Sequence, residues 1–206
     1  MLMLRAAMAL GLLVGGAGLA AADCASEAKT AMEKRLSAFP FRETIETKGD
    51  GFGASIQIEF ASLENLHFNQ TQTGGNAPAH SEQVFLDGKA WEKLASSWQP
   101  VEDAKSTLEG ITGAEQGFSN LYTDGAVVTC LGPVKRDGRM LTAYDLQVNA
   151  DTADDPPFAT MHLEVNAANG LPQSFEANQL GEAGPIKSVY TFSYDKPVKI
   201  VAPVAN

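Results

Sequence analysis

Residues 158–203 read FATMHLEVNAANGLPQSFEANQLGEAGPIKSVYTFSYDKPVKIVAP, and this stretch decides the class of fold. It divides into three expected strands, residues 158–165, 173–178 and 187–194, with turns rich in Gly, Asn and Pro between them. The first strand alternates: Met161, Leu163 and Val165 fall on one side, and Thr160, His162 and Glu164 on the other. A period of two is typical of a strand with one buried face. The stretch therefore predicts an antiparallel sheet whose apolar face the rest of the chain must cover.

The first 22 residues have the pattern of an export signal. Arg5 precedes an apolar run, residues 6–19, and Ala20-Ala21-Ala22 fits an A-x-A cleavage site. We expect cleavage after about Ala22, a single mature domain over residues 23–206 and a periplasmic location without stable membrane insertion. An uncleaved signal anchor is the alternative, although the run is short and rich in glycine for a membrane span.

The charge balance limits the classes of partner. The chain has 15 basic and 25 acidic residues among 206, for a formal net charge of −10. Nucleic acid binding needs clustered Lys and Arg, so we expect no nucleic acid partner. The acidic surplus equally disfavours docking on anionic lipid, and it favours a solvated monomer.

Two cysteines, Cys24 and Cys130, are the only ones in the chain. In an exported protein they are expected to form a disulfide. The alternative, free thiols or a redox pair, lacks the C-x-x-C spacing. The bond would tie the first helix to a strand in the middle of the chain.

The rest of the mature chain adds two helical regions and further strands. A helix is expected over residues 26–37, with Ser26 as its N-cap, and helical spacing returns over residues 101–111 and 114–121. Gly110 and Gly113 leave open whether this central insert is one helix, two short helices or a mobile segment. Expected strands occupy residues 41–48, 54–61, 66–73, 82–86, 89–94, 126–134 and 140–148, with Asp-Gly turn signals at 87–88 and 137–138.

This succession predicts an α+β fold with about nine or ten short strands. An antiparallel sheet of that size curls, and the helices must lie on its apolar, concave face. We therefore expect a half-open β-barrel with an N-terminal helix and a central helical lid. Such a curled sheet can leave a groove for hydrophobic ligands.

The order of these motifs resembles a known superfamily. The strand pair around Phe85-Leu-Asp-Gly-Lys-Ala-Trp91, the central helical insert, the Gly170-Leu-Pro172 turn and the ending Tyr190-Thr-Phe-Ser-Tyr-Asp-Lys-Pro197 are similar to periplasmic lipoprotein carriers and lipid-binding lipoproteins, the LolA, LolB and LppX-like group. The resemblance implies a half-barrel closed by a helical lid that holds acyl chains, with no enzymatic activity and no cofactor. The carriers have an Arg-Pro pair where this chain has Ala61-Ser-Leu-Glu64, which weakens a dedicated role in lipoprotein transfer.

Ten large side chains are the candidates for a ligand pocket on the concave face: Phe60, Phe85, Trp91, Trp98, Phe118, Tyr144, Met161, Leu163, Phe175 and Phe192. Trp98 and Phe118 are assigned to the helical insert, where they would close the groove. Each of the ten could instead fill an ordinary core, and periodicity alone does not decide between these interpretations.

No motif of a hydrolase, zinc protease, nucleotide-binding loop or dinucleotide fold occurs, so no catalytic or metal-ligating residue is assigned. The aspartates at 151, 154 and 155 lack the spacing of a calcium loop, and His162 is expected at the surface. The sequence favours a binding or carrier protein for lipid or acyl chains, working with a membrane-associated donor or acceptor. A protein-interaction or envelope-sensing module on the same fold is the alternative, and an uncharacterised hydrolase ranks third.

Overall fold

The computed structural model of the chain describes residues 17–74, 79–121, 126–148, 159–181 and 184–204. Its helices are α1 (Ala17–Arg35) and α2 (Ala104–Leu121), and its strands are β1 (Phe41–Gly49), β2 (Phe52–Phe60), β3 (Leu66–Gly74), β4 (Ala79–Leu86), β5 (Lys89–Leu94), β6 (Ser97–Pro100), β7 (Val127–Arg136), β8 (Arg139–Val148), β9 (Ala159–Asn166), β10 (Pro172–Gly181) and β11 (Gly184–Ser193).

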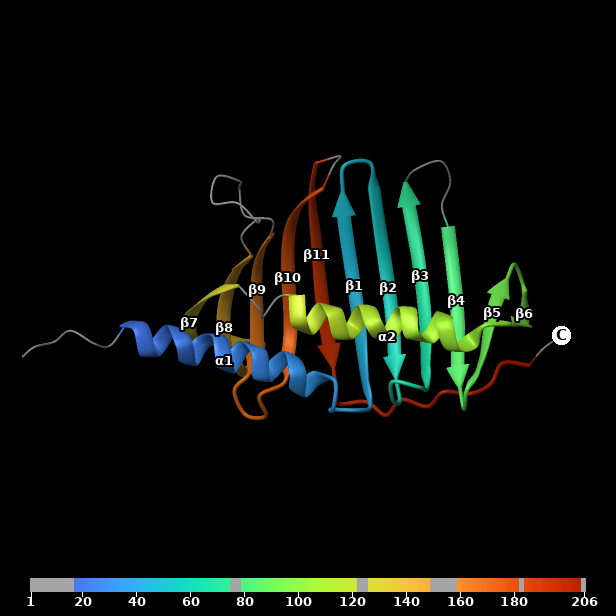
Figure 1. Cartoon of the computed structure of the whole chain (residues 1–206), viewed down its shortest axis with the longest axis horizontal. Coiled ribbons are helices and arrows are strands. Elements are labelled where there is room, and N and C mark those ends of the chain that lie inside the picture. Colours follow the sequence, from blue (N-terminus) through green and yellow to red (C-terminus); the bar gives the residue numbers. More distant parts are fainter. Residues whose placement is uncertain (1–16, 75–78, 122–125, 149–158, 182–183, 205–206) are drawn as a thin grey trace, which may run out of the picture.

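All eleven strands form one antiparallel sheet that does not close into a barrel. Their order is β6-β5-β4-β3-β2-β1-β11-β10-β9-β8-β7, so β6 and β7 are the two edges. Both helices lie across the same side of the sheet, as Figure 1 shows. The predicted α+β half-barrel with an N-terminal and a central helix is confirmed.

The topology explains why α2 crosses the sheet. Strands β1 to β6 lead from the centre to one edge, and β7 to β11 lead from the other edge back to β1. The connection from β6 to β7 must therefore span the width of the sheet. Helix α2, with 18 residues, supplies about 27 Å of that span across the concave face (Figure 1).

The Asp-Gly signals form hairpin turns as expected. Asp87 and Gly88 have φ values of 52° and 75°, and Asp137 and Gly138 have φ values of 51° and 79°. Two consecutive residues in this left-handed region are typical of the turn that matches the twist of antiparallel strands. These turns fix the registers of β4 with β5 and of β7 with β8.

Helix α1 differs from the prediction at its start. It begins at Ala17, so Ser26 lies inside the helix and is not its cap. The alanine-rich residues before Ser26 are strong helix formers, and they extend the helix into the expected export signal. The buried face of α1 consists of Cys24, Ala28, Ala31, Met32 and Arg35.

The central insert forms one helix, despite its two glycines. Asp103 begins it, because its carboxylate accepts a hydrogen bond from the Ser106 N–H at 3.0 Å. A side chain at Gly110 or Gly113 would meet no other atom within 4 Å, so both glycines face open space. The apolar residues on the other side of α2 pack on the sheet and outweigh the low helix propensity of glycine.

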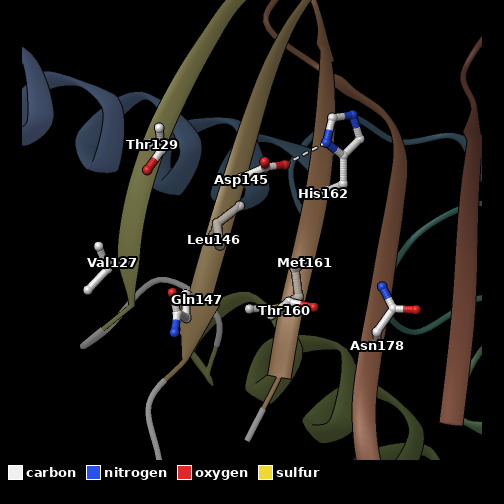
Figure 2. Close-up of a pocket in the computed structure, with 9 residues that line it drawn as sticks. All are labelled: Val127, Thr129, Asp145, Leu146, Gln147, Thr160, Met161, His162 and Asn178. Atoms are coloured by element: carbon white, nitrogen blue, oxygen red, sulfur yellow. Dashed lines mark hydrogen bonds and ion pairs between the residues drawn. The ribbon is translucent and has the colours of Figure 1, made fainter. Parts of the chain in front are cut away.

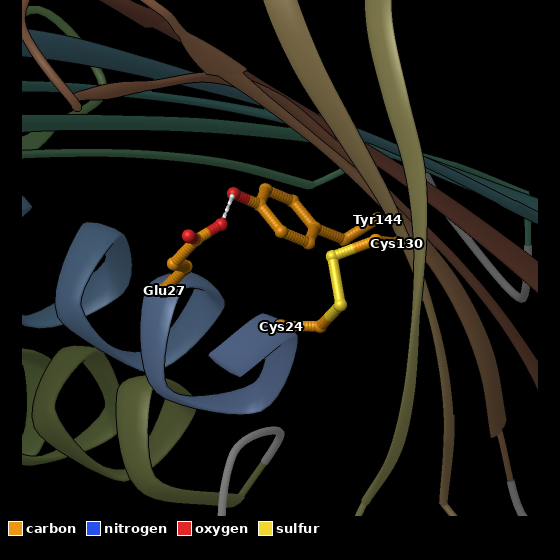
Figure 3. Close-up of a disulfide and its surroundings, with 4 residues drawn as sticks. All are labelled: Cys24, Glu27, Cys130 and Tyr144. Carbon is orange, nitrogen blue, oxygen red and sulfur yellow. Dashed lines mark hydrogen bonds between the residues drawn. A yellow bond between two sulfur atoms is a disulfide. The ribbon is translucent and has the colours of Figure 1, made fainter. Parts of the chain in front are cut away.

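A disulfide between Cys24 and Cys130 joins α1 to β7, as predicted (Figure 3). It links residues 106 positions apart, so it restricts a large loop of the unfolded chain. Next to it, the Tyr144 hydroxyl donates a hydrogen bond to Glu27 of α1 at 2.9 Å. Burial and this carboxylate raise the pKa of Tyr144 to about 12. The disulfide and the hydrogen bond together hold α1 to the strands at the β7 end of the sheet.

Two parts of the prediction fall on residues outside the described ranges. The first 16 residues of the expected export signal are one, and the acidic loop with aspartates at 151, 154 and 155 is the other. Within the described ranges, neither helix combines the length and hydropathy that crossing a bilayer requires.

Candidate binding face

The concave face carries two clusters of buried apolar side chains. The cluster under α1, here the α1 cluster, includes Tyr144, Met161, Leu163, Phe175 and Phe192. The cluster near α2, here the α2 cluster, includes Phe41, Ile58, Phe60, Leu66, Phe85 and Ala90. Cross-strand neighbours share a face of the sheet, and pairs such as Phe41 with Phe60 and Phe175 with Leu163 build both clusters. The alternation predicted for β9 therefore holds for its apolar residues.

Seven of the ten candidate pocket residues lie in these clusters. They are Phe60, Phe85, Tyr144, Met161, Leu163, Phe175 and Phe192, and none is more than 4% exposed. At this degree of burial they form the packed core beneath the helices. Whether they also line a ligand pocket stays a prediction. The side chain of Phe118 lies outside those that the structure describes.

The two tryptophans lie on the opposite, convex face. Phe85 pairs with Ala90 on the concave side, so the neighbouring pair of Val84 and Trp91 faces the other way. Trp98 was assigned to the helical insert, and this assignment is wrong, because it lies in β6 and pairs with Lys93. The Lys93 ammonium lies 5.6 Å from the centre of the Trp98 ring. The turn before β6 has Ala95 at a φ of 56°, where a turn normally carries Gly or Asn, so the sequence gives little sign of this strand.

Part of the apolar surface near α2 is not fully buried. Ile56 and Phe68 on the sheet and Leu108 and Ile111 on α2 pack against the α2 cluster, yet each keeps partial exposure. Phe68 is the cross-strand neighbour of Ile58, which places it on the concave face. An apolar row therefore remains accessible where α2 meets the sheet.

A buried ion cluster joins both helices to the sheet. Arg35 from α1 donates through Nη1 to Glu43 of β1 at 2.8 Å and to Glu115 of α2 at 2.7 Å. Its Nη2 also reaches the Glu115 carbonyl oxygen at 3.3 Å. The side chains of Arg35 and Glu43 are 0% exposed. The rings of Phe41 and Phe192 both lie close to the guanidinium carbon, with ring centres at 5.9 and 5.2 Å.

This ion cluster holds two carboxylates and one guanidinium, so full ionisation would leave an uncompensated negative charge in the core. Burial raises the pKa of Glu43 well above its usual value, and repulsion from Glu115 is the second cause of the rise. The positive charge of Arg35 opposes it. Burial also raises the pKa of the neighbouring Tyr194 hydroxyl. A proton on Glu43 would remove the uncompensated charge.

Sequence reasoning missed the ion cluster, although one signal was present. In β1, Phe41, Glu43 and Ile45 occupy alternate positions and are all buried. A carboxylate at one of the core-facing positions of a strand needs a buried partner. Its partners come from two other elements, and only the fold shows which residues they are.

The convex face is polar and hydrogen-bonded. A hollow of about 410 Å³ lies over β7 to β10, and 2.8 Å separate His162 Nδ1 from the Asp145 carboxylate oxygen in it. Figure 2 shows this contact and the residues that line the hollow. His162 is 37% exposed, in line with the predicted surface position. Glu164 was expected on this solvated face, but it is 2% exposed, because Arg136 lies over it at 2.8 Å and Ser174 donates to it at 2.9 Å.

No described group of three or more His, Cys, Asp or Glu side chains is arranged to hold a metal ion. Three of the hollows that the structure describes include a predicted pocket residue: Met161, Phe192 or Tyr144. Apart from that residue, each is lined mainly by polar side chains. The accessible apolar row beside α2 is therefore the better candidate for a binding surface.

Comparison with solved structures supports the fold. The structure of LprF from Mycobacterium bovis matches with a TM-score of 0.56 and 11% identity over 88% of this chain and 98% of that one. The lipoprotein LppX from Mycobacterium tuberculosis matches with a TM-score of 0.53 and 13% identity over 87% and 99% of the two chains. A LolA superfamily protein from Nitrosomonas europaea also matches, but its TM-score of 0.31 is too low to support an inference.

The resemblance to the LppX-like group is thus confirmed for the fold. At these identities the similarity extends to the fold alone. No protein-family model matches the chain, and no curated protein matches its sequence.

The ion cluster predicts a large loss of stability when Arg35 alone is replaced. Arg35→Met leaves Glu43 and Glu115 without their cation, and we expect the free energy of unfolding to fall by about 3–5 kcal/mol. Chemical denaturation monitored by circular dichroism measures it. In the matched control, Arg35→Met with Glu43→Leu and Glu115→Leu removes all three charged groups, and most of the loss should be recovered. Equal destabilisation of the single and triple variants would contradict this account.

The raised pKa of Glu43 predicts that the stability of the folded state falls as the pH rises. In the unfolded chain Glu43 loses its proton near its ordinary pKa of 4.5, whereas the folded protein retains that proton to higher pH. The folded state then binds more protons, so this contribution to stability is present at low pH and declines as pH rises above about 4.5. We expect Glu43→Gln to flatten the fall in the urea midpoint between pH 5 and pH 8. The same fall in the variant as in the parent protein would rule out this role of Glu43.

Proposed function

We propose that the chain is an exported, non-enzymatic binding or carrier protein for a hydrophobic ligand, such as a lipid or the acyl chains of a lipoprotein. The ligand would lie along the accessible apolar row where α2 crosses the concave face. One observation carries the proposal: the inner face of α2 and the sheet beneath it both present half-exposed apolar side chains, Leu108 and Ile111 opposite Ile56 and Phe68.

The attachment of α2 supports this role. Just before its start, the Val101 N–H donates to the Ala90 carbonyl oxygen of β5 at 2.9 Å, and in its second half Glu115 enters the ion cluster. Leu108 and Ile111 lie between these two attachments. A helix held at these two points can yield between them to admit an acyl chain while it stays on the sheet. The exposed glycines Gly110 and Gly113 lie in this middle part and lower the cost of bending.

The proposal includes export and a partner. Cleavage after about Ala22 would place the mature domain in the periplasm as a monomer. There it would take its ligand from a membrane-associated donor and pass it to an acceptor. The mature domain keeps the acidic surplus of the whole chain, which favours solubility over attachment to anionic lipid.

A second candidate function rests on the edge strand β7. This strand has ten residues, its outer backbone edge has no strand partner in the described sheet, and Val127 and Leu131 are 57% and 49% exposed. Such an edge can add an extended peptide as a further strand. This observation favours the protein-interaction or envelope-sensing module as the alternative.

Phe68→Asp tests the carrier proposal. It places a carboxylate in the apolar row, and we expect uptake of an environment-sensitive apolar fluorophore to weaken by about tenfold or more, because a charge buried without a partner is costly. Asn69→Asp is the matched control: it adds the same charge to the adjacent residue of β3, which faces the convex side. Fluorescence titration of both variants measures binding, and their melting temperatures show whether each is folded.

Three results can follow. Loss of uptake in folded Phe68→Asp with retention in Asn69→Asp supports the proposal. No uptake by the unmodified protein, or equal uptake by the unmodified protein and folded Phe68→Asp, contradicts it. If Phe68→Asp does not fold, Leu108→Asn on α2 makes the same test from the other side of the row.

A further inference from the structure

Charged residues divide unequally between the two faces of the six central strands, β10, β11 and β1 to β4. The registers place the following nine charged or titratable residues on the convex face: Arg42, Glu46, Lys48, Glu59, His67, His80, Glu82, Glu176 and Lys187. On the concave face of the described residues of these strands, Glu43 is the one ionisable carboxylate, and it is paired with Arg35. The division shows that the concave face is kept free of uncompensated charge.

Two neighbouring rows cross the concave face side by side. The first row, at the level of the half-buried Ile56, contains Tyr190, Ile45, Ile56, Gln70 and Ser81. The second row, two residues further along each strand, contains Ala177, Ser188, Thr47, Ala54 and Gln72. The first row is thus largely apolar from β11 to β2 and carries an amide on β3 and a hydroxyl on β4. The second row consists of small and neutral polar side chains.

The second row offers hydrogen bonds but no counter-charge. The hydroxyls of Thr47 and Ser188 are 3.0 Å apart and hydrogen-bonded to each other. Gln70 and Gln72 each present an amide that both donates and accepts, and both are partly exposed. Residues two apart on a strand are separated by about 7 Å. Gln70 is the cross-strand neighbour of Ile56 and lies one such step from Phe68, whereas Thr47, Ser188 and Gln72 lie one step beyond the row of Ile56.

We propose that the ligand is an amphiphile with an uncharged, hydrogen-bonding head group, such as the hydroxyls of an acylglycerol. This inference rests on the proposed function. The acyl chain lies on the apolar row beside α2, and the head group meets the partly exposed side chains of Thr47, Gln70 and Gln72. A hydroxyl head group exchanges its bonds to water for bonds to these side chains. A carboxylate, phosphate or ammonium head group would lose hydration on a face that supplies no opposite charge.

Competition for a bound apolar fluorophore at pH 8 tests the head group, with 1-monoolein and oleate as probes that share the same acyl chain. We expect half-displacement of the fluorophore at a concentration of 1-monoolein about tenfold or more below that of oleate. Gln70→Lys adds a cation to the concave face and should narrow or reverse this preference. Asn69→Lys adds the same cation on the convex face and should leave the preference unchanged.

The outcomes separate the head-group proposal from the carrier proposal. Displacement by 1-monoolein and oleate at equal concentrations, or no effect of Gln70→Lys on their ratio, overturns the uncharged head group while binding itself stands. If neither probe displaces the fluorophore, or the unmodified protein binds no fluorophore at all, the carrier proposal has failed. If Gln70→Lys does not fold, Gln72→Lys places the cation in the next row of the same face and makes the same test.

Discussion

The buried contact of Arg35 with Glu43 and Glu115 is the interaction on which the arrangement of the two helices depends. It joins the end of α1, the first strand of the sheet and the second half of α2 at one point. A guanidinium suits this position because its planar donors satisfy two carboxylates at once, while the guanidinium carbon lies close to the rings of Phe41 and Phe192. Such a cluster adds little net stability over an apolar core, but it fixes which residues meet.

The topology determines how the two helices lie on the concave face. The connection from β6 to β7 has to cross the sheet, and it does so as an amphipathic helix over a face whose apolar clusters are interrupted by the buried ion cluster and a row of neutral polar side chains. The disulfide and the bond from Tyr144 to Glu27 hold α1 over the β7 end, whereas α2 is attached through Val101, Glu115 and the apolar side chains between them. The apolar side chains under α1 are buried, and those beside α2 include half-exposed ones.

The sequence predicted those parts of the fold that local patterns encode. The alternation of Met161, Leu163 and Val165 and the turns at Asp87-Gly88 and Asp137-Gly138 were sufficient for the sheet, because strand faces and hairpin registers are set by neighbours in sequence. Prediction from the sequence failed where contacts between distant segments determine the structure. The turn before Trp98 has alanine, Ala95, where Gly or Asn is usual, so β6 was not predicted. Only the strand register shows that Trp91 faces the convex side. The ion cluster joins residues from three elements, and periodicity within one element cannot reveal it.

The proposed function requires that the concave face hold an amphiphile in the protein isolated from cells. Native mass spectrometry of the mature protein, purified from the periplasm without detergent, tests this most directly. We expect a fraction of the protein to carry one added mass, and solvent extraction should identify it as an acylated, uncharged lipid. A variant that disrupts the apolar row, such as Phe68→Asp, should lack this added mass. A mass of the protein alone, with no uptake of added lipid, would contradict the carrier proposal and favour the alternative, peptide binding at the β7 edge.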